Sequence, residues 1–156
     1  QEGMMVKKYT SLLIACVVVL GLSAHLEARS KPAEAQQMVT KAAAYLKAQG
    51  KEKAFSEFSN TQGQFRKGEL YVFVLNMNAD ILAHGCKRRM IGKGSFDLAD
   101  PDGKCFLKEI VEVAKAKQSG WVTYKWTNPL TKKVERKSTY LQKVDDVIVC
   151  SGAYTS

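Results

Sequence analysis

Two runs of alternating residues, joined by a proline turn, constrain the fold of this chain more than any other segment. Over residues 120–126, aromatic or aliphatic residues alternate with mostly polar ones. A similar run follows over residues 132–141, after an Asn-Pro turn. Side chains on a β-strand point alternately to opposite faces, and proline cannot continue a strand ladder, so the pattern predicts a β-hairpin. One face of its first strand would carry Val122, Tyr124 and Trp126, and the other would carry Trp121, Thr123 and Lys125.

This hairpin also carries the first indication of a function. Aromatic rings with a hydrogen-bonding edge can enclose a small ligand and orient it, and a nearby lysine can supply the countercharge of an anion. The alternative is that the same rings only pack a half-buried sheet. The residues of the hairpin alone leave both interpretations open.

Helical periodicity precedes the strands. Ser30 can cap a helix that starts near Pro32, a favoured residue of the first turn, and ends at Gly50. A second, short helix is predicted over residues 51–58. The chain therefore begins its folded part with two consecutive helices.

Further strands and a third helix complete an α+β domain. Residues 70–75 and 81–84 are apolar runs separated by a five-residue hairpin loop. Loop-like sequence fills residues 85–103, a helix is predicted at 104–117, and residues 147–149 supply the last strand. We expect five mostly antiparallel strands, with a helix before the sheet and loops plus a helix inserted after the second strand.

The N-terminal segment has the pattern of a secretory signal. Lys7 and Lys8 precede an apolar stretch over residues 12–24, which is shorter than the roughly 20 residues that a membrane helix needs. Residues 1–28 are interpreted as an upstream extension with a cleaved signal peptide, and residues 29–156 as one domain. Cleavage would leave a periplasmic or secreted protein that is not integral to the membrane. The alternative is an uncleaved N-terminal anchor.

Export makes the remaining cysteines informative, because disulfides persist in oxidising compartments. Three cysteines remain, Cys86, Cys105 and Cys150, so at most one intramolecular pair can form, and none of them belongs to a CxxC pair. Loop-like surroundings would allow a bridge between Cys86 and Cys105, although free thiols are the preferred interpretation. Cys150 lies in an apolar strand and is expected to be a buried free thiol.

Composition and charge narrow the class of function. The 156 residues are 46% hydrophobic and 25% charged, which is ordinary for one globular domain, and the formal net charge is +9. Dense basic clusters are limited to residues 87–89 and 132–133, so binding of nucleic acid is not indicated. A basic domain can also lie against an anionic membrane or favour small acidic ligands through its overall field, and a solvated surface is the default interpretation for most of these charges.

Catalysis, a metal and a cofactor all lack a sequence pattern. No serine or cysteine stands in a recognisable nucleophile motif, and His84 is the one histidine left after removal of the leader. Asp97, Asp100 and Asp102 resemble part of a calcium loop, but the EF-hand spacing fails. Helix capping and a Pro-Asp-Gly turn explain these carboxylates more simply. The chain is not expected to be an enzyme.

Six short motifs follow one another along the predicted domain. They lie at residues 68–75, 82–85, 91–104, 120–129, 137–140 and 151–154. Their order and spacing resemble the second subgroup of the single Cache family of extracellular sensor domains. The resemblance implies a PAS-like five-stranded antiparallel sheet behind a long N-terminal helix, with a ligand pocket between the sheet and the inserted loops. It also implies a small organic ligand, often a short carboxylic acid.

The resemblance places a set of ligand-binding positions around this pocket. They are Tyr71, His84, Arg88, Arg89, Met90, Tyr124, Trp126, Lys137 and Tyr140. Lys137 and Tyr140 are three residues apart and face opposite sides of a regular strand unless a bulge intervenes. Tyr124, Trp126 and Tyr140 are therefore preferred as lining over Lys137. His84 has a second interpretation, as a strand-end residue whose hydrogen bonds are satisfied locally.

The resemblance also bears on partners. Sensor domains of this family continue into a second membrane helix and an output module, whereas nothing follows Ser156 here. We expect a stand-alone exported binding domain that presents its ligand complex to a membrane receptor or kinase. The alternative is an envelope interaction module whose pocket is filled by its own side chains and whose basic surface docks a receptor or acidic partner.

Overall fold

The computed structural model of the chain describes residues 31–93 and 96–155. The predicted leader and the predicted Ser30 cap lie outside the described residues. Within the described ranges, no helix combines the length and the apolar character that crossing a bilayer requires.

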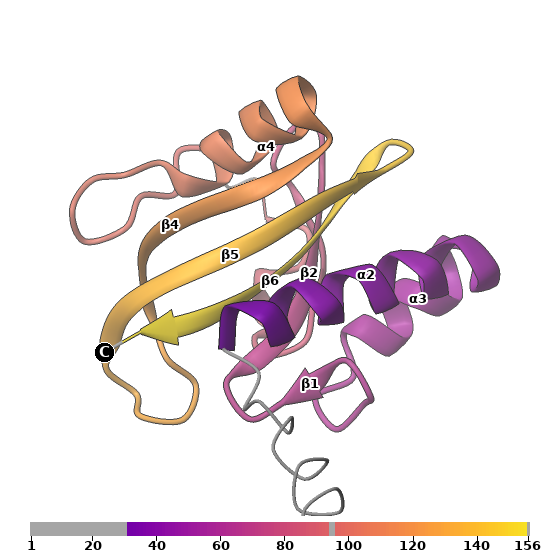
Figure 1. The fold of residues 1–156 in the computed structure, drawn as a ribbon, viewed down its shortest axis with the longest axis horizontal. Helices are drawn as coiled ribbons and strands as arrows, with labels where there is room; N and C mark the ends of the chain where they lie inside the picture. The colour runs from indigo at the N-terminus through magenta and orange to yellow at the C-terminus, as the bar shows by residue number, and fades with distance from the viewer. Residues whose placement is uncertain (1–30, 94–95, 156) are drawn as a thin grey trace, which may run out of the picture.

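An antiparallel sheet forms the middle layer of the domain (Figure 1). Its strands are β1 (Arg66–Lys67), β2 (Leu70–Asn76), β3 (Ile81–His84), β4 (Ser119–Thr127), β5 (Val134–Val144) and β6 (Val147–Thr155). The order across the sheet is β1-β2-β6-β5-β4, and β3 also pairs with β2. The predicted α+β fold is confirmed, with all five expected strands present and the two-residue strand β1 added to them.

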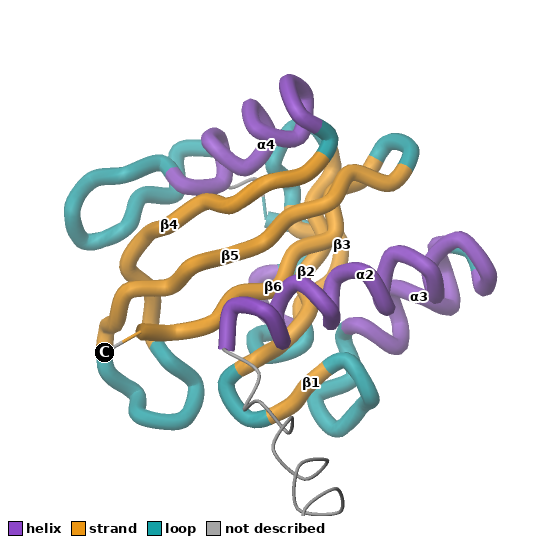
Figure 2. The backbone as a smooth tube through the Cα atoms, viewed as in Figure 1, coloured by secondary structure: helices purple, strands orange, loops and turns teal. Residues whose placement is uncertain are grey.

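One face of the sheet is covered by two helices. α2 (Lys31–Gln49) lies across β5 and β6, and α3 (Lys51–Phe58) follows it beside β2 and β3 (Figure 2). Gly50 joins the helices with a φ of 77°, a left-handed conformation that glycine adopts at little cost. Fully buried side chains such as Ala42 and Phe58 pack on the even-numbered residues of β2.

The opposite face is covered by the segment inserted between β3 and β4. This segment contains the 3-10 helix η1 (Arg88–Met90) and α4 (Phe106–Lys117), which packs against β4. Ile110 of α4 is fully buried in a cluster that includes the odd-numbered residues of β2. β2 is therefore covered on both sides, as its continuous apolar run predicts.

The hairpin of β4 and β5 corrects one prediction about its faces. Tyr124 lies opposite Lys137 and Trp121 lies opposite Tyr140, in an unbroken antiparallel register. Directly opposed residues share a face, so Lys137 is on the side of Tyr124, whereas Tyr140 is on the side of Trp121. The preference for Tyr140 over Lys137 as a neighbour of Tyr124 is wrong. No bulge is needed to bring Lys137 to the α4 side of the sheet.

The last strand is longer than the sequence pattern indicated. β6 was predicted over residues 147–149 and runs on to Thr155. Ser151 and Gly152 interrupt the apolar run and have low strand propensity, which weakens the local signal. Pairing with β5 along its whole length carries β6 through these residues.

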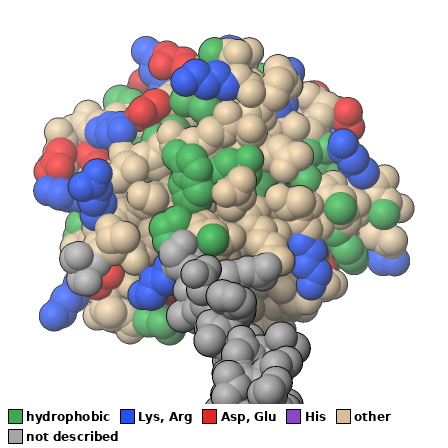
Figure 3. Space-filling model, in the orientation of Figure 1, with side chains coloured by type: hydrophobic (Ala, Val, Ile, Leu, Met, Phe, Trp, Pro, Cys, Tyr) green, Lys and Arg blue, Asp and Glu red, His purple; other side chains and the backbone are tan. Residues whose placement is uncertain are grey.

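The surface on the α2 side carries mixed charge. Figure 3 shows Lys and Arg side chains dispersed over this face and interleaved with Asp and Glu. Trp121 is 41% exposed on this side of the sheet, and its ring centre lies 5.1 Å from that of Tyr140. The dispersed charge agrees with a solvated surface.

Phe58 provides a test of the α3 layer. Its ring is fully buried and packs edge-on against Phe65, with 4.7 Å between ring centres. Phe58→Ala is expected to lower the free energy of unfolding by about 3–5 kcal/mol, because it leaves a cavity in the core. Phe96→Ala removes a ring from a residue that is 41% exposed, and it should change the free energy of unfolding by about 0.5 kcal/mol or less. Urea denaturation measures both, and equal losses would contradict the packing.

Candidate functional site

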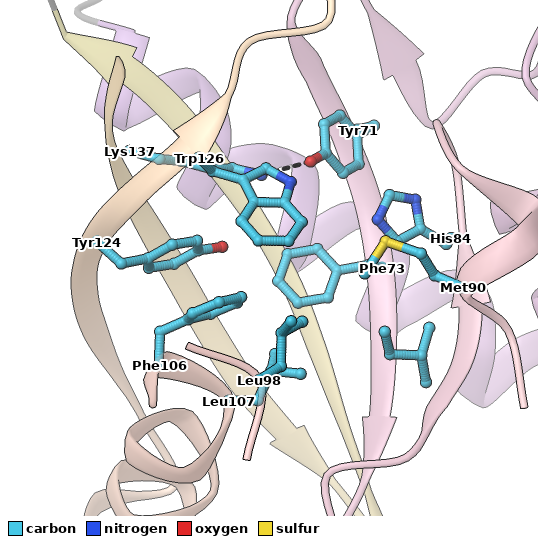
Figure 4. Close-up of a pocket in the computed structure, with 11 residues that line it drawn as sticks. Tyr71, Phe73, His84, Met90, Leu98, Phe106, Leu107, Tyr124, Trp126 and Lys137 are labelled. Atoms are coloured by element: carbon cyan, nitrogen blue, oxygen red, sulfur yellow. Dashed lines mark hydrogen bonds between the residues drawn. The ribbon is translucent and has the colours of Figure 1, made fainter. Parts of the chain in front are cut away.

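A small cavity lies between the sheet and the inserted segment (Figure 4). Its lining comes from four strands, from α4 and from the inserted loops, and consists of Tyr71, Phe73, Ile81, His84, Met90, Leu98, Phe106, Leu107, Tyr124, Trp126 and Lys137. The volume is about 20 Å³, which is room for about one water molecule. The cavity is therefore mostly aromatic and aliphatic, with few polar groups.

Lys137 brings an ammonium group into this lining. The residue is only 1% exposed, although it belongs to β5. Its Nζ atom donates a hydrogen bond of 2.8 Å to the hydroxyl of Tyr71. The same atom lies 4.1 Å from the ring centre of Tyr71, 5.1 Å from that of Tyr154 and 5.4 Å from that of Phe73. Three aromatic rings thus surround the ammonium group and attract it by cation–π interactions.

Gly152 makes room for this lysine. Gly152 is paired with Thr139 across β5 and β6. A Cβ atom at position 152 would lie 2.7 Å from Cε of Lys137 and in collision with Oγ1 of Thr139. A side chain at this position is incompatible with the observed path of Lys137.

Lys137 has no anionic partner among the described residues. The five ion pairs of that part of the chain lie elsewhere, so no carboxylate is within 4.0 Å of Nζ. Burial lowers the pKa of Lys137 from 10.5 to about 7, because removal from water disfavours the charged form. Weaker electrostatic effects come from Cys150, Cys86, Lys87 and Glu69. Near neutral pH the side chain is present both as ammonium and as free amine.

His84 adds a neutral polar group. Its Nδ1 atom accepts hydrogen bonds from the backbone N–H groups of Cys86 at 3.1 Å and Lys87 at 2.9 Å. Burial, followed by the positive charges of Lys137 and Lys87, lowers the pKa of His84 to about 3. The ring is neutral at pH 7, and because Nδ1 is an acceptor, its proton is on Nε2. His84 therefore has the local structural role that was one of its two interpretations, and it also lines the cavity.

Two tyrosines continue the polar contacts of Lys137. The hydroxyl of Tyr71 lies 3.5 Å from that of Tyr154, which donates to the backbone carbonyl of Thr127 at 3.0 Å. Burial raises the pKa of both tyrosines, so both hydroxyls remain protonated at neutral pH. Tyr71 hydrogen-bonds Lys137 directly and Tyr154 contacts Tyr71, but neither hydroxyl can neutralise the charge of the lysine.

Asp100 fastens the inserted segment to the hairpin. Its carboxylate accepts hydrogen bonds of 2.9 Å from the backbone N–H groups of Asp102, Lys104 and Lys125. The bond from Lys125 is the largest cause of its lowered pKa. The predicted turn after Asp100 is present, but α4 starts without a side-chain cap, so the predicted capping role is wrong. The described residues contain no group of three side chains placed to hold a metal ion.

The structure brings most of the predicted site residues together. Those in the lining are Tyr71, His84, Met90, Tyr124, Trp126 and Lys137. Arg88 and Arg89 lie on η1 with exposed side chains and are not part of the lining, so the described residues place no guanidinium group in the lining of this cavity. Tyr140 lies on the other face of the sheet. Binding of a ligand by these residues stays a prediction.

Several lining residues were missed from the sequence. Phe73 is two residues from Tyr71 on the same strand, so period-two parity was the available signal. Phe106 of α4 stacks on Tyr124 of β4 with 4.0 Å between ring centres. A local sequence pattern does not predict such a contact between distant segments. Tyr154 became a neighbour of Lys137 only through the extension of β6.

The three described cysteines are free thiols. Cys86 is half-buried, Cys105 is exposed, and the bridge between them that the sequence allowed is not formed. Cys150 is fully buried, which raises the pKa of its thiol and confirms the prediction for this residue.

Comparison with known proteins places the chain among sensory domains. The family described as Single Cache domain 2 matches residues 4–156. The chain belongs to this family. Cache domains are extracytoplasmic sensory domains that bind ligands, and the resemblance carried by the six motifs is thereby confirmed. The match begins within residues 1–28, the segment that the sequence analysis assigned to an extension and leader.

Individual relatives agree with this assignment. The sensor histidine kinase MctS of Rhizobium johnstonii (strain DSM 114642 / LMG 32736 / 3841) is 30% identical over 86 residues, which are 54% of this chain and 18% of the kinase. The chain thus spans about a fifth of the length of this relative.

Solved structures show the same fold. A Cache chemosensory domain that recognises carboxylic acids superimposes with a TM-score of 0.67 and 22% identity, covering 79% of this chain and 92% of that one. A methyl-accepting chemotaxis protein from Vibrio parahaemolyticus RIMD 2210633 gives a TM-score of 0.69 at 16% identity, covering 96% and 95%.

Gly152 offers a test of the site geometry. Gly152→Ala should lower the free energy of unfolding by about 1–3 kcal/mol, because Lys137 and Thr139 must move to admit the methyl group. Gly120→Ala on β4 is the comparison, since its Cβ meets only a terminal methyl of Val113, at 2.8 Å. Chemical denaturation should show the larger loss for Gly152→Ala. Equal stability of Gly152→Ala and the parent would contradict the observed path of Lys137.

Proposed function

We propose that this Cache domain binds a small organic acid outside the cytoplasm, with the carboxylate of the ligand paired to Lys137. The observation that carries the proposal is a buried amine without a carboxylate partner in the described part of the chain. Burial of an unpaired charge is costly, and an anion in the cavity would offset that cost. The neutral His84 ring would add a hydrogen-bond donor from Nε2.

The relatives support a carboxylate over other anions. One structural neighbour recognises carboxylic acids, and the chain resembles part of a sensor histidine kinase. A membrane receptor or kinase is accordingly the partner that we propose for the ligand complex. Export by a cleaved leader, to the periplasm or the medium, belongs to the same proposal.

The size of the cavity limits the ligand. A volume of about 20 Å³ admits little more than a water molecule, so an acid with two or more carbons needs movement of the lining. Met90, Leu98 and Trp126 are half-buried, whereas Tyr71 and Tyr124 are buried in the core. We expect the half-buried three to move on binding.

The same small volume favours a second candidate function. A cavity nearly filled by its own lining would suit an interaction module that binds a receptor or acidic partner through its basic surface. Such a module would capture a partner in a salt-sensitive manner and would not respond to small acids.

A thermal-shift screen of the domain against short organic acids tests the leading proposal. A ligand at about 100 times its Kd should stabilise the native state by about 2.7 kcal/mol and raise Tm accordingly. Lys137→Met should abolish the response, because the variant lacks the cation. The unliganded variant should be at least as stable as the parent below pH 7, since a buried charge has been removed.

Lys125→Met is the matched control for this screen. Lys125 is on the opposite side of β4, where its ammonium group pairs with Asp102 at 2.9 Å on the surface. This variant should keep the full response. An equal loss of response in both variants would place the acid elsewhere, and no response from any acid at millimolar concentration would favour the interaction module.

Affinity for the acid should decrease at alkaline pH. Free Lys137 has a pKa of about 7, and the carboxylate requires the ammonium form, so binding above that pH takes up one proton. Kd should increase about tenfold per pH unit from about pH 7.5 upward. Calorimetry in buffers of different ionisation enthalpy measures the uptake. A Kd that is constant over this range would contradict the pairing.

The contribution of Lys137 to the stability of the unliganded domain should increase with pH, whereas affinity for the acid decreases. The folded pKa of Lys137 is lowered, so the unfolded chain binds more protons between pH 7 and pH 10.5. The contribution of this lysine to stability therefore increases with pH across that window. The difference between parent and Lys137→Met in denaturation at several pH values isolates it.

A further inference from the structure

Lys137 has the surroundings of a reactive amine as well as those of an anion-binding group. Lysines that form Schiff bases are desolvated in apolar pockets, where the uncharged amine is accessible at neutral pH. The Nζ atom of Lys137 is enclosed by three aromatic rings and has no carboxylate within 4.0 Å among the described residues. Removal from water and the missing carboxylate favour the neutral amine, which is the nucleophilic form, over the cation–π attraction of the rings for the ammonium group.

We propose that Lys137 forms a reversible imine with a short 2-oxo acid, so that the cavity holds this class of acid by a covalent bond. The inference rests on the proposed function, because it uses the same cavity and the same nitrogen atom. It goes further in naming a carbonyl group next to the carboxylate as the feature that is recognised.

Imine formation at this site requires no component beyond the acid. The lone pair of Nζ attacks the carbonyl carbon, a C–N bond forms, and the carbonyl oxygen takes a proton to become a hydroxyl. Loss of that oxygen as water, with both hydrogens of the amine, leaves the C=N double bond. Oxidation states are unchanged, so neither an oxidant nor a reductant is needed.

The tyrosines beside Lys137 are placed to move the protons of this reaction. The hydroxyl of Tyr71 is 2.8 Å from Nζ, and that of Tyr154 is 3.5 Å further along the same chain of contacts. Burial raises the pKa of both tyrosines, so they are protonated and can donate to the carbonyl oxygen as it gains charge. Tyr71 is a positioning residue for the amine and a candidate proton donor.

The remaining lining suits the rest of a 2-oxo acid. Its carboxylate would lie one carbon from the new bond and serve as the counter-anion of a protonated imine. The Nε2–H group of His84 would be a further partner within the lining. Lys87 lies outside the lining, with its ammonium group 5.2 Å from the ring centre of Trp126. A covalent bond also brings the ligand closer than van der Waals contact, which reduces the volume that a cavity of about 20 Å³ must supply.

Reductive trapping of the whole chain tests the proposal. Glyoxylate, the smallest 2-oxo acid, is added with sodium borohydride near pH 7, and reduction of an imine leaves one carboxymethyl group on the lysine nitrogen. Peptide mass spectrometry compares Lys137 with Lys108, an exposed lysine of α4. We expect Lys137 to be labelled at least about tenfold faster, because an ordinary lysine is almost fully protonated at that pH.

Acetate provides the matched control, since it has the carboxylate and lacks the carbonyl. Excess acetate should protect Lys137 and leave labelling of Lys108 unchanged. Labelling of Lys137 no faster than Lys108 would overturn the imine, and thermal stabilisation by acetate would then leave the proposed carboxylate binding intact. Selective labelling of Lys137 without stabilisation by any simple acid would support the imine and contradict the broader proposal. Absence of both effects would overturn both.

Discussion

The burial of one amine in an aromatic enclosure is the constraint on which the site depends. Lys137 is 1% exposed in a sheet that is covered on both faces. The rings of Tyr71 and Tyr154 supply the attraction that water would otherwise provide, and Gly152 supplies the space. A buried amine without an anion carries a free-energy cost that a binding partner can relieve, which makes this lysine different from the many exposed ones.

Polar contacts extend from this amine to the start of the described chain. Tyr154 donates to the carbonyl of Thr127, and the next residue, Asn128, donates to Oε2 of Glu69 at 3.2 Å. Oε1 of Glu69 lies 3.1 Å from the ammonium group of Lys31, the first residue of α2. The environment of the cavity and the first turn of α2 are thus joined by consecutive contacts.

The sequence predicted the elements of the fold better than the arrangement of the site. Hydrophobic periodicity located the described α-helices α2, α3 and α4 and the five main strands, because each buries a continuous stripe or face, whereas the short 3-10 helix η1 was taken as loop. The register of the β4–β5 hairpin is not readable in this way, because the faces of Lys137 and Tyr140 relative to Tyr124 depend on how many residues form the loop between the strands. Burial of a lysine also runs against the usual exposure of this residue type. The motif positions nevertheless included Lys137 with Tyr124 and Trp126, and all three line the cavity.

The size of an acid that the cavity could admit depends on which parts of its lining can move. Phe106 stacks on Tyr124 at 4.0 Å between ring centres, and the hydroxyl of Tyr124 accepts a hydrogen bond of 3.0 Å from Thr139, so movement of this wall would disturb the packing of α4 on the sheet. Trp126 is half-buried near the end of the same strand, β4. Its ring packs edge-on against that of Phe106, with 5.1 Å between ring centres. Opening on the Trp126 side costs fewer core contacts. A larger acid would therefore have to enlarge the cavity on that side.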